Sequence, residues 1–440
     1  MEEPQISIGI LTAKEIRFDL YGEFIIESSE KKFSGRLKAK FENGRINIYH
    51  EKLQIYSASE VIYVPNDLQT ESFLLRDVVI GKNFHWEKKE NQRFRGVLKF
   101  IIEKDEITAV NILPLEEYLI SVISSEMNAR SSKELLKAHA IVSRGWLLSQ
   151  LEKRKGTAVS ESITENEIIR WYDREDHENY DLCADDHCQR YQGVSRIISD
   201  HSAEAISETT GLALTYNNKI CDTRYSKCCG GMTESFENVW EQERHPYLSS
   251  IFDYKFTPDG NGNDLRIEKN AVQWIKSNPN AYCNTSDERI LSQILVDFDR
   301  TTNDFFRWKV EYSNEELSAL IFKKSGMDFG KIIDLIPVER GDSGRLIKLK
   351  IVGTTKTITI GKELEIRKTL SPSHLYSSAF IIIKENIEEG VPGKFILQGA
   401  GWGHGVGLCQ IGAAVMGELG YGFDEILTHY FRGTKIKKIY

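Results

Sequence analysis

The 440-residue sequence lacks several features that would assign it to a functional class at once. No window approaches the roughly 18 consecutive apolar residues of a transmembrane helix, so no membrane-spanning segment is expected. The formal charge is −8 and no lysine–arginine block is present, which argues against a nucleic-acid partner. Internal repeats and low-complexity tracts are also absent. What remains is a globular composition, 40% apolar and 28% charged, that suffices for a large core.

The sequence also shows little of what marks a secreted protein. Its N-terminus, Met-Glu-Glu-Pro, has no apolar stretch typical of a signal peptide. Either the protein is cytosolic or a leader has already been removed, and the strand-like run that starts at Gln5 favours removal. Seven cysteines, an odd number spread over a long chain, make a poor disulfide framework. No C-x-x-C redox motif occurs.

Residues 1–110 are predicted to form a β-rich module. Apolar residues alternate with small or polar ones over Gln5–Thr12, the period of a half-buried strand. Asn43-Gly44 lies between two alternating runs and predicts a tight hairpin, because both turn positions need positive φ. No cluster of catalytic residues lies in this region, so we expect it to be a support or binding module.

The second region, 111–440, begins with a predicted helix. Leu115, Leu119 and Val122 form one apolar stripe at helical spacing, and Glu126 falls four residues later on the same stripe. Burial raises the pKa of a carboxyl group, and a carboxyl held protonated near neutral pH is what a general acid needs. The alternative is an exposed or ion-paired glutamate at a helix end.

Two stretches of this region are expected to be irregular. Residues 152–200 are polar and dense in acids, and residues 252–340 are predicted to be a loop-rich insertion. Helices and strands alternate elsewhere. The expected fold is α+β, a β-rich mixed fold with a few helices, in which the helical segment that carries Glu126 packs on antiparallel sheets.

The polar stretch holds two histidines and two cysteines within twelve residues, namely His177, Cys183, His187 and Cys188. This ligand set matches tetrahedral zinc, and four protein ligands would make the ion structural. The surrounding acids favour a cation, whereas adjacent ligands at His187 and Cys188 strain the geometry. The alternative is a surface loop with a Cys183–Cys188 disulfide.

A glycine-rich turn near the C-terminus, Gly399–Gly407, carries His404 between glycines. A phosphate-binding loop is excluded, because no Walker Lys-Ser/Thr follows and too little chain remains for a βαβ unit. Alternating glycines imply a close approach of the backbone to another group. The alternative is a tight turn with an incidental histidine.

Paired cysteines precede paired glycines at Cys228-Cys229-Gly230-Gly231. This motif is compatible with zinc, a redox pair or a tight turn. Taken alone, it favours a turn.

Five sequence blocks together resemble the SpoIID/LytB family (stage II sporulation protein D). They occur in the family's order across 111–440 and comprise Leu113–Tyr118 with Ser125–Met127, Leu136–Ala140 with Arg144, Gly230–Glu234, Gly403–Ala413 and Glu425–Thr434. The family usually has Ala-Ala before the glutamate, Pro after the methionine, and Thr or Ser after the arginine. Here Ser124-Ser125, Asn128 and Gly145 stand at those positions.

The resemblance implies a lytic transglycosylase that cleaves the MurNAc–GlcNAc bond of peptidoglycan glycan strands and leaves 1,6-anhydroMurNAc ends. Glu126 is then the catalytic acid/base. The His/Cys loop is similar to a zinc-binding element of the family, which implies a structural zinc ion. We expect the substrate to be bound by residues of the remaining motifs, which are Arg144, Tyr225, Gly230, Gly231, Thr233, Glu234, His404 and Gln410.

The LytB side of the family supplies an alternative, a non-catalytic peptidoglycan-binding enhancer with a cell-wall amidase as its partner. Both interpretations imply the cell envelope. A third, a β-rich adhesin that recognises carbohydrate, accounts for residues 1–110 but not for the C-terminal motifs.

Overall fold

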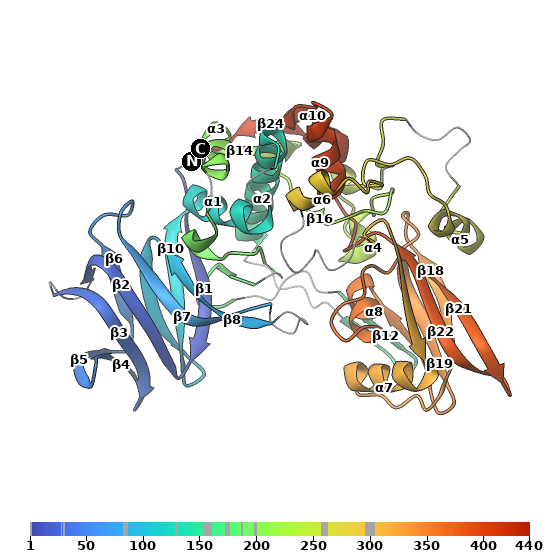
Figure 1. The fold of residues 1–440 in the computed structure, drawn as a ribbon, viewed down its shortest axis with the longest axis horizontal. Coiled ribbons are helices and arrows are strands. Elements are labelled where there is room, and N and C mark those ends of the chain that lie inside the picture. The colour runs from blue at the N-terminus through green and yellow to red at the C-terminus, as the bar shows by residue number, and fades with distance from the viewer. Residues whose placement is uncertain are drawn as a thin grey trace. The chain divides into compact units, whose positions relative to one another are not determined.

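The computed structural model describes residues 2–27, 29, 31–81, 87–127, 131–153, 161–171, 177–185, 188–197, 200–256, 263–294 and 304–440. The chain forms two compact units from discontinuous segments (Figure 1). The first unit comprises Met1–Ala129, Arg174–Gly211 and Lys438–Tyr440, and the second comprises Arg130–Asp173 and Leu212–Lys437. The fold is α+β and rich in strands, as expected from the sequence.

One 11-stranded sheet forms the framework of the first unit. Its main path follows β13 (Leu182–Cys183), β1 (Gln5–Ala13), β10 (Glu106–Pro114), β9 (Val97–Glu103), β6 (Val61–Pro65), β2 (Glu15–Ile26), β3 (Lys32–Glu42), β4 (Arg45–His50) and β5 (Leu53–Ala58). Off this path, β7 (Ser72–Ile80) pairs with β2 and with β8 (Lys88–Phe94). Neighbours are antiparallel except β13, which is parallel to β1.

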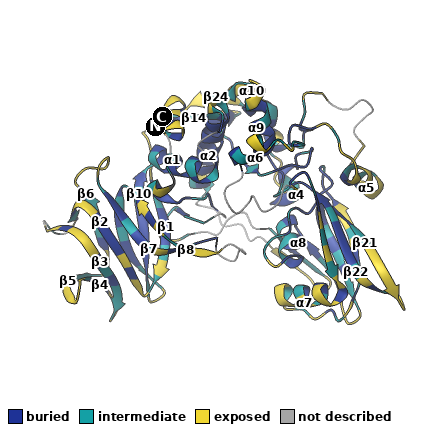
Figure 2. Cartoon of the chain, in the orientation of Figure 1, coloured by how far each residue is buried: buried dark blue, intermediate teal, exposed yellow. Residues whose placement is uncertain are grey.

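Side-chain alternation explains why these segments form strands. Ile6 and Ile8 on β1 are buried, whereas Gln5 is exposed and Ser7 is half-buried. Figure 2 shows buried and exposed residues along the strands of this sheet. The predicted hairpin between β3 and β4 is present, with φ of 53° at Asn43 and 73° at Gly44. The aromatic rings of Phe18 and Phe100 pack 5.0 Å apart in the core.

The two units do not divide near residue 110, where the sequence suggested a boundary. Residue 110 lies inside β10, which is hydrogen-bonded to both β1 and β9, so a boundary there would cut a central strand. The helices α1 (Leu115–Glu126), η1 (Gly193–Arg196) and α3 (His201–Glu208) complete the first unit.

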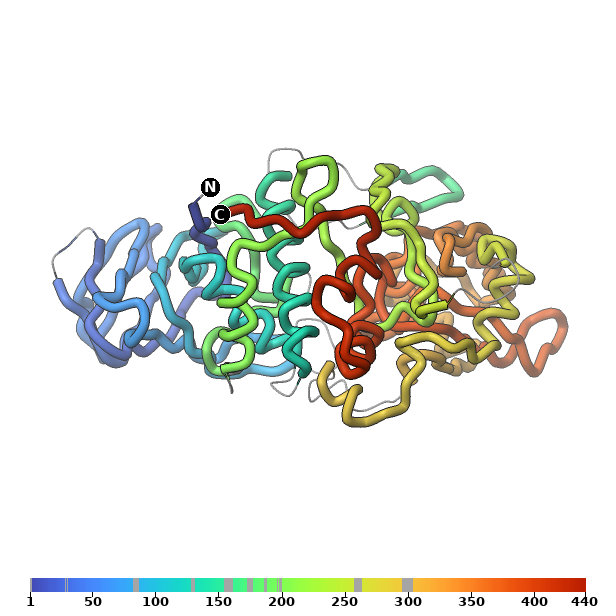
Figure 3. Tube along the Cα trace, turned by 90° about the horizontal axis from the view of Figure 1, so that it is seen from above, coloured from blue at the N-terminus to red at the C-terminus, as the bar shows by residue number. Residues whose placement is uncertain are grey.

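Figure 3 shows the two ends of the chain close together, and hydrogen bonds join residues near both ends to the start of α1. The backbone N–H of Leu115 donates to Pro4 O at 3.0 Å, and Tyr440 Oη donates to Glu116 Oε1 at 2.5 Å. The last residues are therefore part of the packing of the first unit.

The second unit contains several small sheets. The five-stranded sheet has the order β11 (Glu161–Ile163), β12 (Glu167–Arg170), β20 (Thr357–Gly361), β19 (Leu346–Gly353) and β18 (Ile332–Arg340). The others are β17 (Arg307–Ser313), β22 (Val391–Ala400) and β21 (Phe380–Glu388); β15 (Lys219–Ile220), β14 (Leu212–Tyr216) and β24 (Lys435–Lys438); and the pair β16 (Tyr225–Ser226) with β23 (Leu408–Cys409). A shared apolar core includes Trp308, Leu349 and Phe395.

The second unit also contains the long, largely buried helix α2 (Lys133–Lys153). The others are α4 (Phe236–Val239), η2 (Pro246–Leu248), α5 (Glu268–Lys276), α6 (Glu288–Ile294), α7 (Asn314–Ser325), α8 (Glu363–Thr369), α9 (Gln410–Glu418) and α10 (Phe423–Tyr430). Among the described residues, no helix is long and apolar enough to cross a membrane.

The two stretches expected to be irregular contribute regular structure. Residues 152–200 include β12, which pairs in parallel with β20. Residues 252–340 include α5, α6, β17, α7 and β18, so they supply strands to two sheets. The partners of these strands lie far away in the sequence, and local composition does not report such pairing.

Candidate active site

Glu126 is the last residue of α1 in the first unit. Pro114 stands before the first turn, where acidic Glu116 and Glu117 suit the positive end of the helix dipole. The helix ends because Met127 is extended, with ψ of 154°. The Glu126 side chain is half-buried, and its Oε1 lies 3.4 Å from the donating N–H nitrogen of Arg190. The carboxylate is thus neither in the core nor fully solvated.

Residues 189–193, which include the Arg190 N–H, are held against α1 by hydrogen bonds and ring stacking. Tyr118 Oη donates to Gln189 Oε1 at 3.2 Å, and Ser121 Oγ donates to Gly193 O at 3.0 Å. The rings of Tyr118 and Tyr191 stack with centroids 5.1 Å apart. These contacts come from the helix face opposite to bulk solvent and fix the backbone that faces Glu126.

The structure gathers three of the four expected zinc ligands in the first unit. One ligand atom from each of His177, Cys183 and Cys188 lies within 4.8 Å of the others, and His177 Nε2 is 3.8 Å from Cys188 Sγ. Tetrahedral Zn–S and Zn–N bonds place such atoms about 3.6 Å apart. The donor set therefore fits zinc. His187 lies outside the described residues.

The His/Cys loop is held to the main sheet at its start. Cys183 lies on β13, opposite Gly9 of β1. Asp181 Oδ2 accepts hydrogen bonds from the backbone N–H and the hydroxyl of Ser7 at 2.8 and 2.6 Å. None of the seven cysteines, all of which the structure describes, forms a disulfide, so Cys183 and Cys188 are not bridged.

In the second unit, two motifs that are distant in sequence lie side by side. β16 pairs in parallel with β23, so that Tyr225 faces Leu408. Isolated bridges join Cys228 to Trp402 and Glu234 to Val406. The residues expected to bind substrate at 225–234 and at 404–410 therefore belong to one constellation.

A buried histidine that the sequence did not single out lies at the centre of this constellation. His139 Nε2 is 3.1 Å from Gln410 Nε2, His139 Nδ1 is 3.2 Å from Ser143 Oγ, and the Tyr225 ring packs 4.6 Å away. Because an amide nitrogen only donates, His139 Nε2 accepts and Nδ1–H donates to Ser143. Burial, aided by the nearby Lys227 charge, lowers the pKa of His139 to about 3. Its place in the Leu136–Ala140 block was the signal for it.

His404 is half-buried within the glycine-rich turn. Its Nδ1 accepts the backbone N–H of Val406 at 3.0 Å, and its ring packs edge-on against Trp240 with centroids 4.9 Å apart. Burial, reinforced by the positive charge of Arg224, holds the pKa of His404 well below its usual range. The ring is therefore neutral, with its proton on Nε2.

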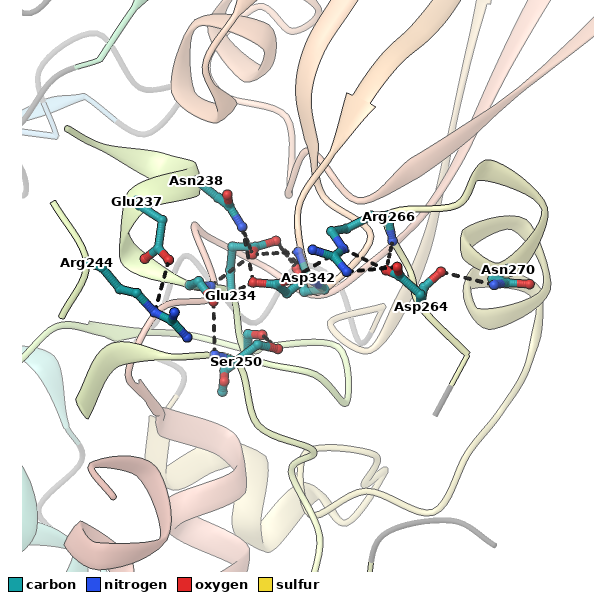
Figure 4. A network of polar contacts seen from close by, with 12 residues as sticks. Glu234, Glu237, Asn238, Arg244, Ser250, Asp264, Arg266, Asn270 and Asp342 are labelled. Atoms are coloured by element: carbon teal, nitrogen blue, oxygen red, sulfur yellow. Dashed lines mark hydrogen bonds and ion pairs between the residues drawn. The ribbon is translucent and has the colours of Figure 1, made fainter. Parts of the chain in front are cut away.

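Glu234 is 1% exposed, and both of its oxygens are engaged inside the protein (Figure 4). Oε1 accepts from Ser235 N, Asn238 Nδ2 and Asp342 N at 2.9, 2.7 and 2.9 Å. Oε2 accepts from Ser343 N and Ser343 Oγ at 3.1 and 2.6 Å. This carboxylate orders the turn around Asp342 and Ser343.

The remaining expected site residues are also buried. Arg144 Nη1 donates to Leu212 O at 2.9 Å, and Thr233 Oγ1 accepts the N–H of Ile251 at 2.8 Å. Gly230 has φ of 78°, and a Cβ there would meet the backbone N of Gly401 at 2.9 Å. Gly231 has φ of 99° and packs against Trp274 in the same way. These buried residues hold the backbone of the constellation in place.

Of the eight expected substrate-binding residues, Tyr225 and His404 are the two that are only half-buried. Trp402 beside them is half-buried as well, but one face of its ring stacks on Phe305 with centroids 4.8 Å apart. Tyr225 and His404 are therefore the most accessible of the eight, whereas the other six hold the surrounding backbone.

Comparisons with known proteins match two parts of the chain. Residues 103–216 match the family model described as Stage II sporulation protein, and residues 234–407 match one described as Domain of unknown function (DUF8618).

Three relatives align with most of the chain. An uncharacterized protein of Brachyspira hyodysenteriae is 26% identical over 78% of this chain and 72% of its own length. Stage II sporulation protein D of Bacillus subtilis is 26% identical over 75% of this chain and 76% of its own length. The amidase enhancer of Bacillus subtilis is 23% identical over 72% of this chain, but only 40% of its own length is covered.

Proposed function

The chain belongs to the SpoIID/LytB family, and from this premise we propose that it is a lytic transglycosylase of the cell envelope. Its substrate is the glycan strand of peptidoglycan, and the bond cleaved is MurNAc–GlcNAc. The observation that carries this proposal is the half-buried carboxylate of Glu126, fixed at the end of α1 by the backbone N–H of Arg190.

One carboxylate suffices for this reaction. The Glu126 carboxyl protonates the glycosidic oxygen, the bond from C1 to that oxygen breaks, and GlcNAc leaves as the alcohol. Glu126 then takes the proton from the C6 hydroxyl as its oxygen bonds to C1, which closes the 1,6-anhydro ring. Because nucleophile and electrophile belong to one sugar, effective concentration replaces the second carboxylate of ordinary glycosidases.

The surroundings of Glu126 suit both of its roles. Half-burial shields the carboxyl group from bulk water, and the Arg190 N–H stabilises the carboxylate left after proton donation. The same hydrogen bond restricts the side chain, so less orientation is required when the substrate binds.

Zinc at the His/Cys loop has a structural role in this proposal. His177, Cys183 and Cys188 would hold the ion, with His187 as the expected fourth ligand. A closed tetrahedral site supplies folding energy and leaves no position for water. The benefit for catalysis is indirect, because Cys188 leads directly into the segment that carries the Arg190 N–H.

Tyr225 and His404 are the proposed carbohydrate contacts of the second unit itself. His404 is neutral, and its ring bonds to the backbones of Val406 and Tyr225, which holds the two half-buried rings in place. Gln410, Arg144, Thr233, Glu234, Gly230 and Gly231 position these two side chains.

The direct test is Glu126→Gln, which keeps the shape of the side chain and removes its titrating proton. Because a general acid contributes about 10²–10⁴-fold, release of anhydroMurNAc ends should fall by that factor. Products of purified glycan strands are measured by mass spectrometry. Glu117→Gln, also on α1, is the matched control and should retain activity. Parent-level activity in the Glu126 variant would remove this residue as the acid.

Similarity to the amidase enhancer supports a second candidate function, in which the chain binds peptidoglycan and stimulates a cell-wall amidase. The two functions differ in what Glu126 does. If the parent binds glycan strands without releasing anhydro ends, and both it and Glu126→Gln stimulate an amidase equally, the enhancer function replaces the enzyme.

A further inference from the structure

A second cluster of metal-ligand side chains lies inside the second unit, apart from the His/Cys loop. One atom from each of Cys229, Asp253, Cys283 and Cys409 lies within 4.8 Å of the other three, and all four residues are buried. We propose that these side chains bind one structural zinc ion. The site is not needed for the proposed chemistry and stands independently of it.

The distances fit a tetrahedral site. Bonds of about 2.3 Å to sulfur and 2.1 Å to oxygen separate two sulfurs by about 3.8 Å and a sulfur from an oxygen by about 3.6 Å. Cys229 Sγ lies 3.5 Å from Cys283 Sγ and 3.3 Å from Asp253 Oδ2. Binding an ion therefore requires these atoms to separate by only a few tenths of an ångström.

Asp253 has the environment of a one-oxygen ligand. Its Oδ1 accepts a hydrogen bond from Tyr430 Oη at 2.7 Å, and His429 Nε2 lies 3.6 Å away. Its Oδ2 faces Cys229 and accepts the N–H of Cys283 at 3.2 Å. Metal-binding carboxylates are oriented by such outer hydrogen bonds. Oδ1 is thus held by the Tyr430 hydroxyl, whereas Oδ2 faces the thiols.

The backbone supports the sulfur ligands as well. The N–H of Cys229 donates to Cys409 Sγ at 3.2 Å. Gly412 allows Tyr430 to reach Asp253, since a Cβ at this position would lie 2.3 Å from Tyr430 Oη and 2.7 Å from Asp253 Oδ2. These contacts hold Cys409 and Asp253 in place within the cluster.

A metal explains this set of side chains better than a disulfide does. A Cys229–Cys283 bond would use two thiols and leave Cys409 beside the fully buried Asp253 carboxylate. One zinc ion instead engages all four groups, and thiolate ligands select soft metals such as zinc.

The ligands come from four separate places in the chain, so the ion would cross-link this unit. Cys229 precedes the Gly230-Gly231 turn, and Cys409 precedes Gln410, which contacts His139. Asp253 and Cys283 lie before and after α5. Zinc would therefore fix the backbone under the substrate-binding constellation.

The experiment counts zinc in the purified full chain by elemental analysis and then separates the two sites. The parent should hold two ions, and a Cys183→Ser/Cys188→Ser variant should hold one. In that variant, cobalt should give thiolate-to-metal charge-transfer absorption, and adding Cys283→Ser should abolish it. Cys221→Ser is the matched control, because Cys221 is buried in the same unit outside the cluster, and it should change neither result.

A second readout uses the parent alone and does not depend on the folding of a variant. A chelator should accelerate alkylation of Cys229, Cys283 and Cys409, whereas Cys221 should react at the same rate with or without it. Equal acceleration at Cys221 would show general loosening and overturn the site. Absence of cobalt binding in the loop variant, or a Cys229–Cys283 disulfide found by mass after unfolding without reductant, would overturn it too.

Discussion

At the scale of single residues, the second unit depends on polar side chains that are buried and fully paired. Glu234 accepts hydrogen bonds from four residues, and His139 has one partner for each ring nitrogen. Removing the partner of such a buried group leaves it without a hydrogen bond. This lowers the stability of the protein by about 1–3 kcal/mol for each bond lost. The protonation states of these groups are consequently tied to folding.

The lowered pKa of His139 predicts how the free energy of unfolding changes with pH. Its pKa is about 3 in the folded protein and near 6.5 in the unfolded chain, so unfolding takes up a proton below pH 6.5. The stability associated with the neutral ring is complete above pH 6.5 and is lost progressively as pH falls toward 3, by up to about 1.4 kcal/mol per pH unit.

Urea unfolding between pH 8 and pH 4 measures this effect. His139→Gln should show a shallower pH dependence than the parent, and His50→Gln, which changes an exposed ring in the first unit, should match the parent. An unchanged slope in the His139 variant would mean that the ring takes up its proton without unfolding.

At the scale of elements, the proposed acid on α1 is connected to the His/Cys loop through the residues that follow Cys188. The proposed zinc ion would fix one end of this segment, the stacking of Tyr118 on Tyr191 fixes the other, and Arg190 between them meets Glu126. The loop is a positioning element, so its loss should affect turnover without removing any reacting group.

Cys188→Ser tests that coupling. The variant should lose one zinc per chain while keeping Glu126, and release of anhydro ends should fall up to about 100-fold because misplacement of a catalytic group by about 1 Å costs that much. Zinc content and product formation are measured on the same preparation, with Cys221→Ser as the control. Loss of zinc at full activity would uncouple the loop from the acid.

At the scale of the whole molecule, local signals predicted elements and non-local pairing decided their arrangement. The β1 strand, the α1 helix and the hairpin at Asn43-Gly44 follow from periodicity and turn chemistry. The pairing of β12 with β20 and the continuity of β10 through residue 110 do not, because they depend on partners distant in the sequence.

The candidate sites also include parts that the sequence predicts and parts that it does not. The His/Cys loop was visible because its ligands lie within twelve residues. The buried cluster was not, since its residues lie far apart in the sequence and share no spacing rule. His139 was missed because a helical histidine amid apolar residues resembles an ordinary core residue.

The interleaving of the two units has a consequence for biosynthesis. The first unit lacks the segment at 174–211 until the ribosome has passed it, and β1 keeps an unpaired edge without β13. Nascent chains stalled with residue 173 just outside the exit tunnel should remain sensitive to protease, and chains stalled well beyond residue 211 should gain resistance in this unit. Resistance at the earlier stall would show that the sheet matures without its late strand.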